Sequence, residues 1–314
     1  MKDEELKQII YVSKLYYEHK MSQEQIAKKI SVSRPTVSRM LKTAIDNGYV
    51  KTIVIDPFEN IQNLEREMIN KFKLKHVKIV STVDTDKRYV KSIVGKAAAD
   101  YLVKILKPND ILGVSWGTTL YEVARHIEDT VVDELKIVQM NGFIYENTYN
   151  DYVFGVIKML GTKLHGTTHY LYAQGLTSSI YVRNALLDDR NIRNVLEMSK
   201  NSSIAIFGIG YPERTSMVVK YGYLNNEDLE RLYQNGVKGD ICSRFYDIEG
   251  KIIDKELDDR TISIPLHELR NKEYSIAVAC GANKVSGIIG AICGGYLNVL
   301  ITDEDTAREI LKQS

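Results

Sequence analysis

The loop 113–119 combines glycine and hydroxyl residues in a pattern suited to holding an oxyanion. It reads Gly-Val-Ser-Trp-Gly-Thr-Thr and continues an apolar run, as expected at the carboxyl end of a strand. At such a place the first amides of the next helix attract anions. Gly117 would let a ligand approach the backbone, and Ser115, Thr118 and Thr119 could add hydroxyl contacts to phosphate or sugar oxygens. A tight turn capped by threonine, without a ligand, is the alternative interpretation.

Residues 280–284 place a cation at the expected start of another helix. Positive charge beside the positive end of a helix dipole is unfavourable unless an anion is present. Lys284 is therefore the first candidate for phosphate binding, with Gly281 and Ala282 preceding it in the same turn. A lysine that simply points into water is the alternative.

Two further charged segments follow residue 238. Asp240 and Arg244 come after Gly239 in a segment expected to be a loop, from which they could reach sugar hydroxyls or brace a pocket. Residues 258–260, Asp-Asp-Arg, are interpreted as an ordinary surface charge cluster without an assigned role.

The N-terminal residues carry a different signal, that of a helix-turn-helix. The pattern predicts helices over residues 6–19 and 22–30, a turn at 31–32, and a third helix that begins after Ser33 and ends near residues 47–48. Ser22 and Gln25 have the spacing of a capping box, and Pro35 is tolerated in a first helical turn. The third helix can enter the major groove of DNA, because its inner face is apolar and its outer face is polar and basic. The residues expected to meet bases and phosphates are Ser33, Arg34, Pro35, Thr36, Ser38 and Arg39.

The chain is expected to divide after this unit. Residues 49–55 could form a short strand or wing, and Asp56-Pro57 is a plausible boundary. We therefore expect a DNA-binding domain at 1–56 and an effector domain at 57–314. Residues 57–73 would form a connecting helix whose apolar residues recur every three or four positions, which favours packing on the next domain over a contact with a second subunit.

From residue 77 onward, short apolar runs alternate with helical stretches. Strands are predicted at 77–80, 111–116, 136–140, 204–209, 275–279 and 297–302. Helices between them are predicted to include 90–104, 119–126, 191–199 and 284–292. This alternation predicts an α/β fold with a doubly wound, largely parallel sheet.

Composition excludes several classes of protein. No apolar run approaches the ~18 residues that a membrane span requires, and the charged N-terminus lacks the features of a secretory signal. Three separated cysteines suggest neither disulfides nor a zinc site, and are expected to be small core residues. The net charge of +1 conceals a basic start, because residues 1–51 carry eight Lys and two Arg against six acidic residues, which is +4 and leaves −3 for the remainder.

Three segments together resemble the SorC family of sugar-binding transcriptional regulators. They are residues 33–39 (Ser-Arg-Pro-Thr-Val-Ser-Arg), 113–119 and 239–245 (Gly-Asp-Ile-Cys-Ser-Arg-Phe), and the similarity extends over nearly the whole chain. Within the family the sequence looks closest to the deoxyribonucleoside regulators. The resemblance implies an effector domain related to sugar-phosphate isomerases and deaminases, and a homodimer or homotetramer on operator DNA. It also implies a ligand contact for Asp240 and a mixed structural and ligand role for Arg244.

Asn141 departs from that branch. A lysine followed by two glycines is common there, and its amine can form a Schiff base with an open-chain sugar. Here the residues are Asn141-Gly142-Phe143, and an amide cannot form an imine, so we expect reversible binding with Asn141 and Gly142 at the effector. This departure casts doubt on deoxyribose 5-phosphate as the effector. Lys136 and Lys284 are the pocket lysines that could still form an adduct, and a turn in which Asn141 only satisfies backbone groups is the alternative.

The leading hypothesis is a cytoplasmic repressor controlled by a phosphorylated sugar, with no cofactor, metal or catalytic residue. The rival is a sugar-phosphate isomerase or deaminase with an added N-terminal domain. Such an enzyme needs a positioned general base, which the predicted pocket loops do not offer, since His126, His165 and His169 are expected on helix surfaces or in the core. A third hypothesis is a structural DNA-binding protein with a vestigial pocket.

Overall fold

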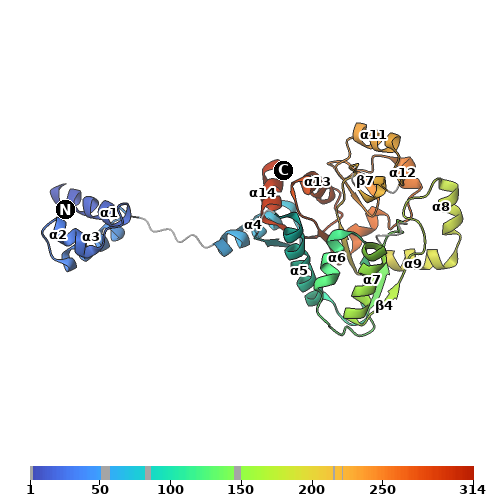
Figure 1. Cartoon of the computed structure of the whole chain (residues 1–314), viewed down its shortest axis with the longest axis horizontal. Helices are drawn as coiled ribbons and strands as arrows, with labels where there is room; N and C mark the ends of the chain where they lie inside the picture. Colours follow the sequence, from blue (N-terminus) through green and yellow to red (C-terminus); the bar gives the residue numbers. More distant parts are fainter. Residues whose placement is uncertain (1–2, 51–56, 82–85, 145–149, 215, 221) are drawn as a thin grey trace. The chain divides into compact units, whose positions relative to one another are not determined.

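The computed structural model describes residues 3–50, 57–81, 86–144, 150–214, 216–220 and 222–314. The chain separates into two compact units, Met1–Pro57 and Phe58–Ser314. Figure 1 shows the helical N-terminal unit and the larger unit built around a sheet. None of the helices in the described segments is long and apolar enough to cross a membrane.

Three helices form the N-terminal unit: α1 (Asp3–Tyr17), α2 (Gln23–Lys29) and α3 (Arg34–Asp46). Their shared core contains Val12, Leu15, Ile26, Ala27, Val37 and Leu41, with Ile30 and Met40 packed against it. This arrangement confirms the predicted apolar inner face of the third helix. The proposed wing at 49–55 lies mostly outside the described residues.

The predicted helix caps of this unit are confirmed. Ser22 Oγ accepts from the amide of Gln25 at 3.3 Å, and Gln25 Oε1 accepts from the amide of Ser22 at 2.9 Å, which completes the capping box. Ser33 Oγ accepts from the amide of Thr36 at 3.3 Å, with proline in the first turn of α3. Local sequence chemistry alone thus determines where α2 and α3 begin.

Seven parallel strands form the sheet of the larger unit, in the order β1-β9-β8-β5-β2-β3-β4. Their bounds are β1 (His76–Val80), β2 (Ile111–Val114), β3 (Lys136–Gln139), β4 (Thr167–His169), β5 (Ile204–Gly208), β8 (Tyr274–Val278) and β9 (Val299–Asp303). The predicted doubly wound parallel sheet is confirmed. Six of its strands match predicted strands, whereas the short edge strand β4 was not predicted.

Helices cover both faces of this sheet. One core joins the strands to α5 (Lys87–Ile105), α6 (Thr118–His126) and α7 (Asn150–Leu164). The other joins them to α4 (Pro57–Phe72), α13 (Val285–Cys293) and α14 (Glu304–Gln313). Leu64 and Met68 of α4 are buried in this second core, so the connecting helix packs on the sheet, as predicted.

The remaining elements lie between β4 and β8, except for η2, which follows β8. They are α8 (Ile180–Leu187), α9 (Arg190–Lys200), α10 (Met217–Lys220), α11 (Asn226–Gln234), β6 (Gly239–Ile241), β7 (Arg244–Tyr246), α12 (Lys255–Asp259) and the 3-10 helices η1 (Leu266–Asn271) and η2 (Ala282–Lys284). The segment expected to be a loop around Asp240 is instead the antiparallel β6–β7 hairpin. Its turn residues, Cys242 and Ser243, both have positive φ, of 54° and 64°. Such a turn usually contains glycine or asparagine, and because neither is present here, the sequence did not indicate a hairpin.

The cysteines differ from the expectation of three core residues. All three are free, and Cys242 is buried, whereas Cys280 is partly exposed and Cys293 is exposed. The prediction was wrong for Cys293 because the last turn of α13 presents its side chain on the surface.

Candidate functional site

The outer face of α3 carries the residues predicted to contact DNA. Ser33, Arg34, Pro35, Ser38 and Arg39 are exposed, whereas Thr36 is partly buried. The hydroxyls of Ser33 and Thr36 lie 2.8 Å apart, so both take part in the N-cap. The two arginines and Ser38 are therefore the side chains most available to bases and phosphates.

In the loop after β2, the first amides of α6 lie at the carboxyl ends of the strands and have no side-chain cap. Gly117 is the N-cap of α6 and has φ 140° and ψ 170°, a conformation accessible almost only to glycine. It offers no side chain to cap the first turn, and a Cβ at this position would meet nothing within 4 Å. The space that a side chain at position 117 would occupy is therefore open. Thr118 is exposed and Thr119 partly so, whereas Ser115 is buried.

The loop after β8 repeats this arrangement. Gly281 has φ 101° and ψ 148°, and it precedes η2 without a side-chain cap. Its amide donates to Asp303 Oδ2 at 3.0 Å and to Thr306 Oγ1 at 2.8 Å, which anchors the turn. Ala282 is exposed and Lys284 is partly buried at the start of α13. A second helix N-terminus thus carries a lysine, as the sequence predicted.

The strand order brings the two loops to the same crevice. β2 and β8 are the two neighbours of β5. From β2 the chain crosses to β3 through α6 on one face, whereas from β8 it crosses to β9 through α13 on the other face. The two connections therefore leave the end of β5 toward opposite faces of the sheet. This reversal is a topological switch point, the place where open α/β sheets bind their ligands.

Asp240 lies at this switch point because the β6–β7 hairpin joins the end of β5. The backbones of Gly210 and Asp240 exchange two hydrogen bonds of 2.8 and 3.1 Å. A Cβ on Gly210 would lie only 2.0 Å from Asp240 Oδ1, so glycine is required for this carboxylate position. Burial raises the pKa of Asp240, while the Lys284 ammonium and the Ser243 amide act in the opposite direction.

Lys284 and Asp240 interact as opposite charges at the switch point. Burial lowers the pKa of Lys284, and attraction to Asp240 and Glu213 partly reverses that effect. Repulsion by Lys91 of α5 lowers the pKa of Lys284 further. The site therefore holds a partly buried acid beside Lys284, with Lys91 close enough to repel Lys284, and an anion together with sugar hydroxyls would match these groups.

Asn141, Gly142 and Arg244 form a second group that supports the site. Asn141 pairs through its backbone with Ser263, and a Cβ on Gly142 would lie 2.4 Å from the carbonyl oxygen of Ala173. Arg244 is buried and donates to the carbonyls of Ser263, Ile264 and Asp258 and to the Asp258 carboxylate.

These contacts indicate different roles for the members of that group. Because its guanidinium group is bonded to protein carbonyls and a carboxylate, Arg244 is expected to brace the surrounding loops rather than to contact a ligand. Gly142 is required because the backbone of Ala173 leaves no room for a side chain there. Asn141 is the exception, because its Oδ1 is buried and has no hydrogen-bond partner among the described residues. Trp116 Nε1 donates to the carbonyl of Gly142 at 2.9 Å and joins this group to the loop after β2.

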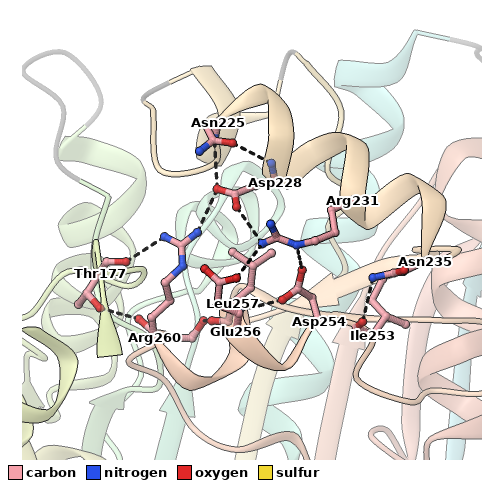
Figure 2. Close-up of polar contacts among 11 residues, drawn as sticks. Thr177, Asn225, Asp228, Arg231, Asn235, Ile253, Asp254, Glu256, Leu257 and Arg260 are labelled. Atoms are coloured by element: carbon pink, nitrogen blue, oxygen red, sulfur yellow. Dashed lines mark hydrogen bonds and ion pairs between the residues drawn. The ribbon is translucent and has the colours of Figure 1, made fainter. Parts of the chain in front are cut away.

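The charge cluster at 258–260 is more ordered than predicted. Arg260 is largely buried; it donates to the carbonyl of Thr177 and forms an ion pair of 3.0 Å with Asp228. Asp228 also pairs with Arg231, which in turn pairs with Asp254 (Figure 2). The interpretation as an ordinary surface cluster was wrong for Arg260, because the tertiary structure brings it to the buried Asp228 of α11, whereas Asp259 pairs at the surface with the exposed Lys255.

Other predicted residues lie away from the switch point. Lys136 is exposed at the start of β3, at the opposite edge of the sheet, so it is not a pocket lysine. His126 ends α6 and His165 follows α7, as expected of helix-surface residues, whereas His169 lies on the edge strand β4 and is only partly buried, which was not predicted. Two cavities of about 220 and 270 Å³ are lined in part by Arg183 and Arg244, and neither is lined by the β2 or β8 loops.

Sequence reasoning missed Lys91 and Gly210. Lys91 is one of several lysines on α5, and nothing in its local sequence separates it from an exposed helix lysine. Gly210 could have been suspected as a glycine just beyond a strand, but the contact that requires it comes from a hairpin 30 residues later. No group of three or more His, Cys, Asp or Glu within the described segments is placed to hold a metal ion.

Together, a helix-turn-helix unit and an α/β unit with polar and charged residues at its switch point indicate a class of protein: DNA-binding regulators that respond to a small ligand. Residues 56–312 match the family described as "Putative sugar-binding domain", and residues 5–52 match the MarR family.

Relatives and solved structures agree with this class. The deoxyribonucleoside regulator of Bacillus subtilis (strain 168) is 37% identical over 310 residues, which cover 98% of this chain and 99% of that protein. The sorbitol operon regulator of Klebsiella pneumoniae is 31% identical, with 98% and 99% coverage. The crystal structure of full-length SorC from Klebsiella pneumoniae covers 99% of both chains with a TM-score of 0.75 and 29% identity. A DeoR family regulator from Listeria monocytogenes has a TM-score of 0.74 at 29% identity, over 80% of this chain and 99% of its own.

The chain belongs to the SorC family of sugar-binding transcriptional regulators. It is a DNA-binding transcriptional regulator controlled by a sugar effector, and it resembles the deoxyribonucleoside regulator along its full length. The hypothesis of an isomerase or deaminase is not favoured, because these relatives are regulators.

Proposed function

We propose that this protein is a repressor whose larger unit binds a phosphorylated sugar or polyol without forming a covalent bond. The observation that carries the proposal is the switch point, where the N-caps of α6 and η2 are Gly117 and Gly281, neither of which caps the first amides with a side chain, and where Lys284 is the N-cap of α13. Backbone amides and an ammonium group bind phosphate, while Asp240 can accept hydrogen bonds from sugar hydroxyls. The names of the relatives, a deoxyribonucleoside regulator and a sorbitol operon regulator, agree with a sugar or polyol ligand.

The proposed contacts divide according to ligand group. Phosphate would be held by the loop residues of the two helix N-termini, and the sugar by Asp240 and Asn141. The loop residues in question are Ser115, Gly117, Thr118, Thr119, Gly281, Ala282 and Lys284. Gly142 and Arg244 would keep the sugar side of the site in place.

Noncovalent binding follows from the side chain at position 141. Asn141 cannot form an imine, and its buried Oδ1 lacks a protein partner in the described structure, which suits a hydrogen bond from a sugar hydroxyl. Borohydride treatment in the presence of aldehyde sugar phosphates, followed by intact-mass measurement, tests this point. A stoichiometric reduced adduct on Lys284 would refute noncovalent binding.

On the DNA side, we propose residues 1–56 as the DNA-binding domain and 57–314 as the effector domain, with 57–73 connecting them. The exposed residues of α3 would bind operator DNA from a homodimer or homotetramer in the cytoplasm, since two recognition helices can read two half-sites. Effector binding would shift the oligomer away from the DNA-bound state, which requires different effector affinities in the two states.

A thermal-shift screen with sugar phosphates tests the effector proposal. A ligand at a hundred times its dissociation constant should add ~2.7 kcal/mol to the free energy of unfolding. Lys284→Ala should weaken binding of the phosphorylated ligand far more than of its unphosphorylated form. Equal losses for both forms would remove Lys284 from the phosphate site, and turnover of a sugar phosphate would instead support an enzyme.

A further inference from the structure

Lys91 of α5 reaches the uncapped start of α6. Its Nζ donates to Thr118 Oγ1 at 2.9 Å, and its side chain is only partly exposed. The two helices approach closely, since a Cβ on Gly95 would lie 2.7 Å from Glu122 Cβ. Lys91 and Thr118 each lie four residues before these contact positions, and both helices run away from the carboxyl edge of the sheet (Figure 1). Close helix packing thus positions the ammonium group beside the first amides of α6.

The same ammonium group acts on the loop that follows β8. Lys91 and Lys284 both influence the thiol of Cys280, the residue that precedes the glycine turn there. Lys91 also repels Lys284 directly. The two lysines come from opposite faces of the sheet, because α5 packs in one core and α13 in the other.

Two cations beside two helix N-termini concentrate positive charge at one place. Each helix N-terminus adds about half an elementary charge. Asp240 and Glu213 are the carboxylates that attract Lys284, and neither lies on α5 or α6. The charge at the start of α6 therefore suits an anion with more than one negative charge.

We propose that Lys91 is the second cation of the effector site, and that Lys91 and Lys284 together hold one phosphomonoester dianion. This inference rests on the proposed function, because it concerns the same site. A phosphate monoester carries about 1.5 to 2 negative charges at neutral pH and has three acceptor oxygens, which match two ammonium groups and two sets of amides. A carboxylate, with one charge and two oxygens, would offer fewer acceptor atoms and less charge to the two ammonium groups and the two sets of amides.

The test compares four variants of the full chain with the wild type, one of which is the Lys284→Ala variant introduced above. Lys91→Met removes the charge but keeps most of the length of the side chain, and Lys91→Arg keeps the charge. Lys96→Met is the matched control, because Lys96 is an exposed lysine on the same helix. Thermal-shift titrations with inorganic phosphate and with acetate, at constant ionic strength, give the affinity of each protein, and unfolding without ligand reports on the fold.

The expected result is selective for charge at position 91. Lys91→Met should lower phosphate affinity by about tenfold or more, the effect of one charge-assisted hydrogen bond. Lys91→Arg should stay within about threefold of the wild type, Lys96→Met should be unchanged, and acetate should stabilise each protein less than phosphate. The inference is overturned if Lys91→Met binds phosphate like the wild type while Lys284→Ala does not. If the wild type binds neither phosphate nor any sugar phosphate, the proposed function itself fails.

Discussion

Substituting Gly210 by alanine would probe the sugar side of the site through a single methyl group. The new Cβ would lie 2.0 Å from Asp240 Oδ1 and 2.8 Å from its Cγ, well inside the distance that two such atoms can share. The backbones of the two residues are held together by two hydrogen bonds, so the Asp240 side chain has to rotate away. Overpacking of this kind costs about 1–3 kcal/mol of stability.

Effector binding should fall by more than this loss of stability explains. A displaced carboxylate can no longer accept hydrogen bonds from a ligand hydroxyl, and one hydrogen bond to a charged group contributes ~1.5–3 kcal/mol. Effector affinity in Gly210→Ala should therefore decrease roughly 10-fold to 150-fold. Urea unfolding measures the first effect, and calorimetry with a sugar phosphate identified by the thermal-shift screen measures the second.

Two controls decide whether the clash with Asp240 is the cause. Gly208→Ala, two residues earlier at the end of β5, should be nearly neutral, because its Cβ would meet Leu120 Cδ2 at an ordinary 3.5 Å. In an Asp240→Ala background, Gly210→Ala should cost little, since the clashing oxygen is gone. Equal stability losses in the two backgrounds would refute the reasoning, because a double-mutant cycle without coupling means that the two side chains do not meet.

Three further predictions concern the helix starts and the DNA-binding face. Arg34→Ala and Arg39→Ala should each weaken operator binding by ~1–3 kcal/mol, and a lost phosphate contact should also flatten the salt dependence; unchanged affinity in both variants, by electrophoretic mobility shift, would remove α3 from the interface. Ser33→Ala removes the cap of α3 and should lower the free energy of unfolding of the N-terminal unit by ~1 kcal/mol, which an unaltered thermal transition of that unit would contradict. Gly117→Ala should cost ~1–3 kcal/mol through backbone strain alone, as its Cβ meets no neighbour; a variant as stable as the wild type in urea would show that the loop can relax.

Features that depend on neighbours in the sequence were predictable from the sequence alone. The caps at Ser22 and Ser33 follow from side chains that bond amides three residues away, so their pattern locates α2 and α3. The alternation of apolar runs and helices likewise predicted the parallel sheet, because each strand buried on both faces leaves a short apolar run. Gly117 and Lys284 stood out for the same reason, since each begins a helix directly after a strand.

Other features of the site depend on residues that only the folded chain brings together. Lys91 is ordinary in its own helix and becomes significant because α5 packs against α6. Asp240 reaches the site because the β6–β7 hairpin pairs with the segment after β5. The two turn residues of this hairpin have left-handed backbone conformations, but neither is a glycine, so the sequence did not indicate the turn. Arg244 was open to two roles until its guanidinium group was found to donate to backbone carbonyls 14 to 20 residues away. Hydrogen bonding and charge act over a few ångströms in space, whereas a local sequence pattern records only the neighbours along the chain.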